Sequence, residues 1–381
     1  MEFLDYTVLR VIWWALLGVL LIGFAVTDGF DMGVASLLPF VAKTETEKRV
    51  AINTIGPVWE GNQVWLILGG GAIFAAWPAL YAVSFSGFYF AMFIALVALI
   101  LRPVAFKFRS KRECTQWRSM WDVALFIGGL VPALIFGVAV GNVLLGVPFY
   151  FDDTLRPFYD GNLFGLLNPF ALVTGVLSVL MLSTHGALWL SLKASGQVQA
   201  RANMIAMWSI PLVGVVFVLL GVVVHLWLPG FVITSEVVTD GPSNPLLKEV
   251  SIVTGGWGSN FDTYPLFWIA PLVGLAGLVV AWFAMLMRIE WVAFVGSKLS
   301  IGGIITTVGL SMFPFILPSS QDPSQSLTVW DASSSELTLF IMLIATLIFM
   351  PLILAYTAWV FKVLFGRVTE EYVEDNQHTL Y

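Results

Sequence analysis

Acidic side chains within otherwise apolar stretches are the part of this sequence best suited to chemistry. Asp28 and Asp31 lie in TDGFDMG, Glu60 lies in WEGNQVWL, and Asp122 follows a tryptophan. Carboxyl groups that are partly withdrawn from water can take up and release protons, because burial disfavours their charged form. Acids of this kind are what a path for protons through a membrane protein would require.

The elements that position these acids must be membrane helices. Of the 381 residues, 59% are hydrophobic and 11% are charged, and the mean hydropathy of +0.89 excludes a soluble protein. Backbone amides must be paired in hydrocarbon, so long apolar runs predict helices, and the alternation typical of a β-barrel is missing. The single cysteine, Cys114, excludes an internal disulfide and a multi-cysteine cluster. We therefore expect an all-α integral membrane protein.

Apolar runs long enough to cross a bilayer predict about nine transmembrane helices in a single membrane domain that spans residues 1–381. They lie near 8–27, 62–80, 81–103, 121–143, 165–190, 204–228, 265–287, 291–317 and 337–361. The second run is the weakest, because Gly69-Gly70-Gly71 and Pro78 lower its helix propensity. Longer polar loops are expected at 144–164, 229–264 and 318–336.

The distribution of basic residues predicts the orientation of the chain. Of the 18 lysines and arginines, only Arg10, Arg156 and Lys248 fall on the side of the N-terminus. The others lie after helices one, three, five and seven or in the C-terminal tail, and basic loops stay in the cytoplasm. We therefore expect the N-terminus outside the cell and the C-terminus in the cytoplasm.

This topology places the four acids at one membrane depth. The first helix has crossed roughly 30 Å by Asp28, at the cytoplasmic edge, and Asp31 shares its face if the helix continues. Glu60 opens the second helix and Asp122 opens the fourth on the same side. For Glu60 and Asp122, capping of a helix N-terminus is an equally good interpretation. For the aspartates of TDGFDMG, the alternative is a glycine turn that ends the helix.

The histidines do not predict a haem site in this chain. His378 lies in the tail, and His185 and His225 lie toward opposite membrane faces, roughly 20 Å apart in depth by helix rise. They cannot hold one iron together, so each of these two is interpreted as a hydrogen-bonded packing residue. We assign no metal ligand and no catalytic centre to the chain itself.

Several stretches resemble subunit II of the bacterial cytochrome bd quinol oxidases. They include VIWWALLGVLLIGFAVTDGFDMGV, VWEGNQVWLILGGGAIFAAWP, SGFYFAMFIALVALILRPVAF, MFPFILPSS and YTAWVFKVLFGRVTEEYVEDNQHTLY. The similarity runs from end to end. It implies a helical subunit of a terminal oxidase in the bacterial inner membrane, with a periplasmic N-terminus.

For the complex, the resemblance implies cofactors and partners outside this chain. It implies a subunit I that holds two b-type haems and haem d and oxidises ubiquinol near the periplasmic face. Oxygen is then reduced to water with cytoplasmic protons, so a proton motive force arises without pumping. The resemblance further implies a very small third subunit of one helix, a structural ubiquinone in subunit II of some members, and surrounding lipid. We expect no nucleic-acid partner.

The matching motifs also imply roles for individual residues. They assign Asp31, Glu60 and Asp122 to a proton route at the interface of the two subunits, with Asp28 and Trp59 adjacent. The chain departs from a close relative at Lys107, where that relative has an aspartate. A cation cannot relay protons as a carboxylate does, so the entrance of the route is not assigned.

An ion-coupled transporter is the alternative function. Acids within the membrane and interrupted helices also mark that class. Transporter acids lie near the midplane of the bilayer, whereas the acids of this chain are expected at one edge. A protein that holds its own haem is a third interpretation, which the small number of histidines disfavours.

Overall fold

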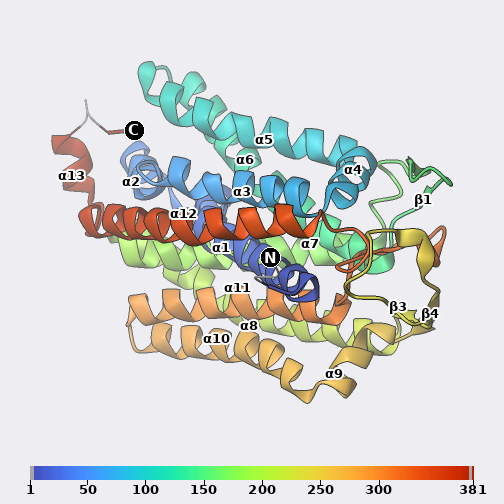
Figure 1. Ribbon diagram of the computed structural model, residues 1–381. Coiled ribbons are helices and arrows are strands. Elements are labelled where there is room, and N and C mark those ends of the chain that lie inside the picture. The colour runs from blue at the N-terminus through green and yellow to red at the C-terminus, as the bar shows by residue number, and fades with distance from the viewer. Residues whose placement is uncertain (1–3, 377–379) are drawn as a thin grey trace.

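Long helices that run side by side form most of the molecule (Figure 1). The computed structural model describes residues 4–376 and 380–381, so His378 lies outside the described residues. Within this part of the chain, eight helices are long and apolar enough to span a membrane. They are α1 (Tyr6–Val41), α5 (Tyr89–Phe108), α6 (Thr115–Leu145), α7 (Pro169–Lys193), α8 (Gly196–Leu226), α10 (Ile269–Leu286), α11 (Glu290–Met312) and α12 (Glu336–Val363). The expected all-α membrane fold is confirmed.

The run expected at 62–80 does not form a further helix of that kind. It is replaced by α3 (Trp59–Ala76), which carries polar residues in its first turns, and by the short α4 (Pro78–Gly87). The amide of Ser334 donates a hydrogen bond to the carbonyl oxygen of Ala76, so α3 ends against the loop before α12. The count of nine crossings is therefore not confirmed, although α3 lies alongside the other helices (Figure 1).

The first helix is longer than the sequence predicted. The expected run stopped near residue 27, but α1 continues as a helix to Val41. Every residue from 28 to 38 is buried, so packing against neighbouring helices keeps this segment helical. Gly29 and Gly33 lie inside the helix, and the interpretation of TDGFDMG as a helix-ending turn is wrong.

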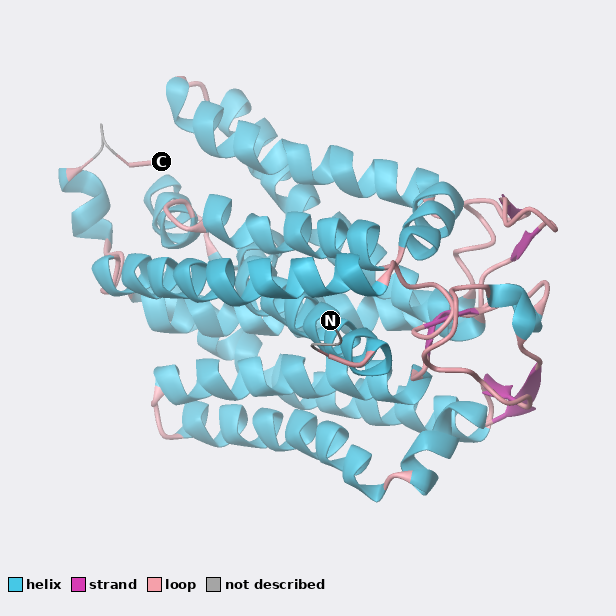
Figure 2. Cartoon of the chain, viewed as in Figure 1, coloured by secondary structure: helices cyan, strands magenta, loops and turns pink. Residues whose placement is uncertain are grey.

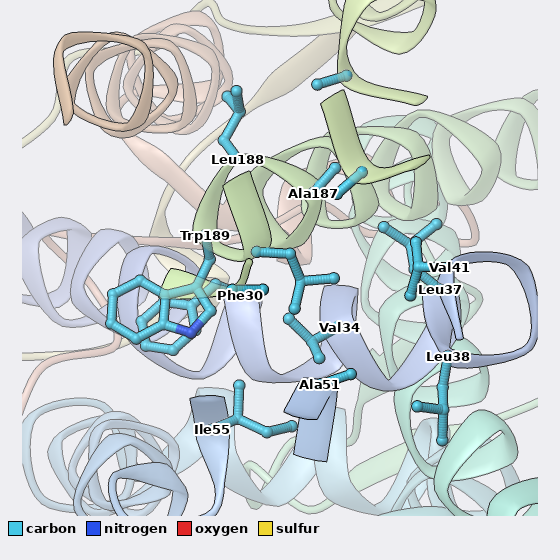
Figure 3. Close-up of a cluster of buried hydrophobic side chains, with 14 of the residues drawn as sticks. Phe30, Val34, Leu37, Leu38, Val41, Ala51, Ile55, Ala187, Leu188 and Trp189 are labelled. Carbon is cyan, nitrogen blue, oxygen red and sulfur yellow. The ribbon is translucent and has the colours of Figure 1, made fainter. Parts of the chain in front are cut away.

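A cluster of buried side chains fixes α1 against α7 (Figure 3). The ring of Phe30 stacks on that of Trp189, with 4.2 Å between the ring centroids. A Cβ atom on Gly33 would collide with the backbone of α7, so glycine at this position permits the close approach. Because Phe30 faces α7, helical geometry turns Asp28 and Asp31 toward the opposite side of α1.

One end of the bundle carries the strands (Figure 2). Three antiparallel pairs lie in or next to the expected polar loops: β1 (Phe149–Phe151) with β2 (Pro157–Tyr159), β3 (Pro229–Ile233) with β4 (Val250–Thr254), and β5 (Phe315–Leu317) with β6 (Leu327–Thr328). Most of the short helices are also found there: η2 (Pro245–Leu247), η3 (Gly256–Gly258), α9 (Ser259–Thr263), η4 (Pro265–Trp268) and η5 (Pro323–Gln325). Arg10 of α1 donates hydrogen bonds to Thr239 and Ser333, which ties two of these loops to the first helix.

The opposite end carries α2 (Glu45–Ile55) and α13 (Glu370–Asp375), which pack on each other (Figure 1). Arg201, in the first turns of α8, donates hydrogen bonds to the carbonyl oxygen of Val41 and to Glu47. The segments after α1, α7 and α12 therefore meet at this end. They are among the segments in which the basic residues are concentrated.

Candidate functional site

A buried ion pair joins α1 to α5. The guanidinium of Arg102 donates from Nη1 to Oδ2 of Asp28 over 2.9 Å and from Nη2 to Oδ1 over 2.5 Å. Neither side chain is exposed. On the neighbouring α6, a Cβ atom on Gly128 would collide with the side chain of Arg102, so this glycine leaves room for the arginine. The two-pronged geometry supplies the hydrogen bonds that a buried charge pair requires.

Asp31 lies one turn further along α1 and is also fully buried. Its Oδ2 accepts a hydrogen bond from Nδ2 of Asn62 over 2.8 Å. Its Oδ1 has no hydrogen-bond partner among the described residues. The cluster of Asp28, Asp31, Arg102 and Asn62 thus contains two carboxyl groups but only one guanidinium. We call these four residues the buried cluster.

A second group of charges surrounds Asp122 near the end of α5. Oδ1 of Asp122 accepts from Nε of Arg109 over 2.5 Å, and Oδ2 accepts from Nζ of Lys48 over 2.8 Å. Arg109, which lies in the short η1 (Arg109–Lys111), also pairs with Glu45 over 2.7 Å. Asp122 is two turns into α6 and does not cap it, so the capping interpretation of this residue is wrong. We call Glu45, Lys48, Arg109 and Asp122 the end cluster.

The two clusters lie along one side of α5. Arg102 and Arg109 are seven positions apart, which is two turns and roughly 10 Å of helix rise. The buried cluster is closed off from solvent, whereas Glu45 of the end cluster has a side chain that is 39% exposed. The charged groups therefore lead from the end of the bundle toward its interior.

Glu60 does not join either cluster. It is exposed in the first turn of α3, where its charge suits the helix dipole, and its side chain makes no hydrogen bond to another described residue. The residue of this segment that reaches Asp31 is Asn62. Trp59 is buried and its ring stacks on that of Phe106, with 5.5 Å between centroids. The four acids, which the sequence predicts at one membrane depth, are thus distributed over two clusters and an exposed glutamate.

The basic partners were not identified as site residues from the sequence. In the sequence, Arg102 and Arg109 contribute only to the excess of basic residues on one side. Arg102 does offer a signal, because it directly follows the apolar run ALVALIL and must be buried or reach the surface. Asn62 is part of the WEGNQVWL motif, but the sequence does not indicate that it contacts Asp31. Lys107 stands where the resemblance implies an aspartate in a close relative. Its side chain is exposed, and its Nζ lies 5.7 Å from the ring centroid of Tyr381.

Among the described histidines, His185 does not fit a haem ligand. Nδ1 of His185 lies 2.7 Å from Oγ of Ser297 and its Nε2 lies 3.0 Å from the carbonyl oxygen of Val26, so both ring nitrogens are occupied. This confirms the packing interpretation of His185. His225 is exposed near the end of α8, where its side chain makes no hydrogen bond with other described residues, so the interpretation as a hydrogen-bonded residue is not supported there. We derive no chemical step through haem in this chain.

Comparison with known proteins agrees with the helical fold. The chain matches the family model of cytochrome bd terminal oxidase subunit II over residues 9–364. It is 51% identical to the probable cytochrome oxidase subunit 2 of Haemophilus influenzae, over 99% of this chain and 100% of that protein. It is 50% identical to the cytochrome bd-I ubiquinol oxidase subunit 2 of Escherichia coli K12, also over 99% of this chain and 100% of that protein.

A solved structure shows the same fold at lower sequence identity. The bd oxidase of Geobacillus thermodenitrificans matches with a TM-score of 0.64 and 16% identity, over 94% of this chain and 99% of that chain. The fold and the buried charges define a multi-pass helical protein of the membrane. The chain belongs to the cytochrome bd terminal oxidase subunit II family.

Membership of this family settles the class of protein. The chain is a subunit of a bacterial terminal oxidase complex, an oxidoreductase of the inner membrane that contains haem and a subunit I. The alternative of an ion-coupled transporter is not supported.

Proposed function

We propose that this chain supports the haem-bearing subunit I and supplies acids that carry cytoplasmic protons toward the reduction of O2 to water. In this proposal subunit I holds the two b-type haems and haem d, and ubiquinol is the electron donor, as in the name of the Escherichia coli relative. A proton motive force then arises without pumping, because the protons consumed come from one side only.

The observation that carries the proposal is the unequal pairing of the two buried aspartates. Arg102 matches the charge of Asp28, while Asp31 has the neutral Asn62 as its partner and one oxygen without any. A carboxyl group that changes its protonation must not be locked to a fixed counter-charge, since such a pair holds the ionised form. Asp31 therefore meets the requirement for a proton carrier, and Asp28 meets that for a fixed support.

The end cluster is the proposed entrance. Glu45 is partly exposed, Asp122 is 11% exposed, and Arg109 connects them. Protons pass from this cluster along α5 to Asp31, and they bypass Lys107. Glu60 joins the proton route at the interface with subunit I, because an acid that is exposed on one subunit becomes enclosed when the partner covers it. Trp59 packs beside this route.

The orientation of the chain is part of the proposal. The end with α2 and α13 faces the cytoplasm and the end with the strands faces the periplasm, because the lysines and arginines are concentrated at the former. The exposed apolar surface of α5 supports an interface with subunit I. On this surface, the side chains of Phe90, Phe93 and Ile100 are each more than half exposed. We also propose, from the family resemblance alone, that the complex contains a third subunit of one helix and that this chain binds a structural ubiquinone.

The experiment compares variants of the whole complex. Asp31→Asn and Glu60→Gln are expected to slow oxygen consumption while the haem absorption and the yield of complex stay unchanged. Asp153→Asn is the matched control, because Asp153 is an exposed acid at the strand end of the bundle.

Three outcomes decide the matter. Slow turnover with full haem content in Asp31→Asn, but not in the control, supports proton transfer. Unchanged turnover in Asp31→Asn and Glu60→Gln would remove both residues from the path. Loss of the complex in Asp31→Asn would favour a structural role for this carboxyl group.

A further inference from the structure

A pocket of about 430 Å³ lies away from both charge clusters, at the end of the bundle that carries α2 and α13. Its walls come from the first turns of α8, the turn between α10 and α11, and the segment after α12. Helices α8, α10 and α11 lie next to one another on one side of the molecule (Figure 1). The proposed proton route uses none of the residues that line the pocket.

The pocket has an excess of positive charge. Arg288 and Arg367 line it together with one acid, Glu290. Arg367 makes only long contacts, 3.3 Å from Nη2 to Oε1 of Glu290 and 3.4 Å from Nη1 to Oε1 of Gln199. Arg288 forms no ion pair with any described residue. Most of the guanidinium donors are therefore free, and a guanidinium matches the geometry of a phosphate group.

The backbone at Arg288 is unusual. Its φ of 59° lies in the left-handed region, which is unfavourable for a residue with a Cβ atom and is normally occupied by glycine or asparagine. An arginine at this turn presents a cation at the rim of the pocket at the expense of local strain. Such strain is commonly kept where a side chain has a task.

The pocket lies at the depth of lipid headgroups. Met204 and Met207 of α8 form apolar parts of its wall. Trp208 of α8, which is 77% exposed, and Trp291 of α11, which is 63% exposed, directly follow the lining residues Met207 and Glu290 in the sequence. Trp291 lies in the first turn of α11, and exposed tryptophans at the ends of membrane helices mark the boundary between hydrocarbon and headgroups. Below this boundary α8 offers a largely exposed apolar face, on which acyl chains can lie.

We propose that this pocket binds the phosphate of an anionic phospholipid, with Arg288 and Arg367 as the phosphate ligands. The methionines contact the glycerol and the first methylene groups, and the acyl chains follow the exposed face of α8. Basic pockets between membrane helices on the cytoplasmic side are suited to anionic headgroups, because each cation attracts the phosphate. A free phosphate ion would gain the charge interaction but would leave the apolar wall uncovered.

The test measures lipid binding to the purified oxidase complex. Delipidated complex is titrated with phosphatidylglycerol, with phosphatidylethanolamine and with inorganic phosphate, and bound lipid is counted by native mass spectrometry. The variant is Arg288→Asn with Arg367→Gln, in which asparagine suits the left-handed backbone. Arg112→Gln is the matched control, because Arg112 is an exposed arginine that does not line the pocket.

We expect the wild-type complex and the control to bind one more phosphatidylglycerol than the double variant, whose affinity falls by about tenfold or more. Equal binding by the double variant would overturn the proposal. So would equal affinity for phosphatidylethanolamine, or full displacement of the lipid by millimolar inorganic phosphate. If the double variant does not assemble, Arg367→Gln alone carries the test, with a smaller loss expected and unchanged binding as the contradiction.

Discussion

Arg102 and Asp28 form a two-pronged ion pair between α5 and α1, with N–O distances of 2.9 Å and 2.5 Å and with both side chains fully buried. The pair joins positions that are 74 residues apart in the sequence. It gives the two neighbouring aspartates different roles, because the charge of Asp28 is matched while that of Asp31 is not. This difference leads to predictions for each residue.

Replacing one partner of the pair should destabilise the subunit. Arg102→Met leaves the carboxylate of Asp28 buried without a counter-charge, which costs about 3–5 kcal/mol. The yield of complex in membranes and its unfolding temperature should both fall. Asp28→Asn combined with Arg102→Met removes both charges and should recover most of the loss. A double variant as unstable as the single variant would contradict the role of this pair.

Asp122 should affect turnover less than Asp31. It shares Arg109 with the partly exposed Glu45, so water and a neighbouring acid can take over part of its role. We expect Asp122→Asn to slow oxygen consumption moderately. Glu45→Gln is the companion variant, since it also removes a partner of Arg109 at the proposed entrance, and a similar moderate slowing is expected. If both variants lower stability equally and leave turnover unchanged, the end cluster is only structural.

His185 should be replaceable without effect on the haems. His185→Phe removes hydrogen bonds to Ser297 and to the carbonyl oxygen of Val26, which should cost about 1–3 kcal/mol of stability. The absorption bands of the complex should keep their positions and relative heights. Loss of one haem band from an otherwise stable complex would show that this histidine has a role beyond packing.

Stability at acid pH should depend on Glu47. Burial alone would raise the pKa of this carboxyl group, but hydrogen bonds from Arg201 and from the amides of Lys43 and Thr44 outweigh that effect and lower the pKa below its ordinary 4.5. The stabilisation is therefore complete above the ordinary value and is lost as the pH falls through the lowered pKa.

The measurement for Glu47 is thermal unfolding of the complex from about pH 7 down to about pH 3. Glu47→Gln should be less stable near neutral pH and should lose less stability on acidification. The exposed Glu236 provides the control, and Glu236→Gln should follow the wild-type curve. Parallel curves for wild type and Glu47→Gln would count against the assigned contacts.

The sequence predicted the class of fold more accurately than the contacts of the acids. Helical spacing placed Asp28 and Asp31 on one face, and the structure confirms that the helix continues through both. The sequence predicts too early an end for α1, because most residues from Val34 to Val41 are held in the helix by packing with α2 and α7 rather than by a pattern of their own.

Partners across the bundle could not be predicted, because they depend on how the helices pack. The pairing of Arg102 with Asp28 and of Asn62 with Asp31 joins residues from three helices, and one sequence contains no signal for such contacts. Arg102 offered a partial signal, since a cation within an apolar run needs a partner or a route to the surface. The outward direction of Glu60 likewise follows only from the packing of α3.

Proton uptake during a single reduction of oxygen tests the central claim most directly. Fully reduced complex is mixed with O2 in the presence of a pH indicator, and uptake is followed together with the haem absorbance. We predict that Asp31→Asn slows uptake by at least about tenfold, equivalent to roughly 1.4 kcal/mol in the barrier, while oxygen binding keeps its rate. Proton uptake at the wild-type rate in Asp31→Asn would contradict the account.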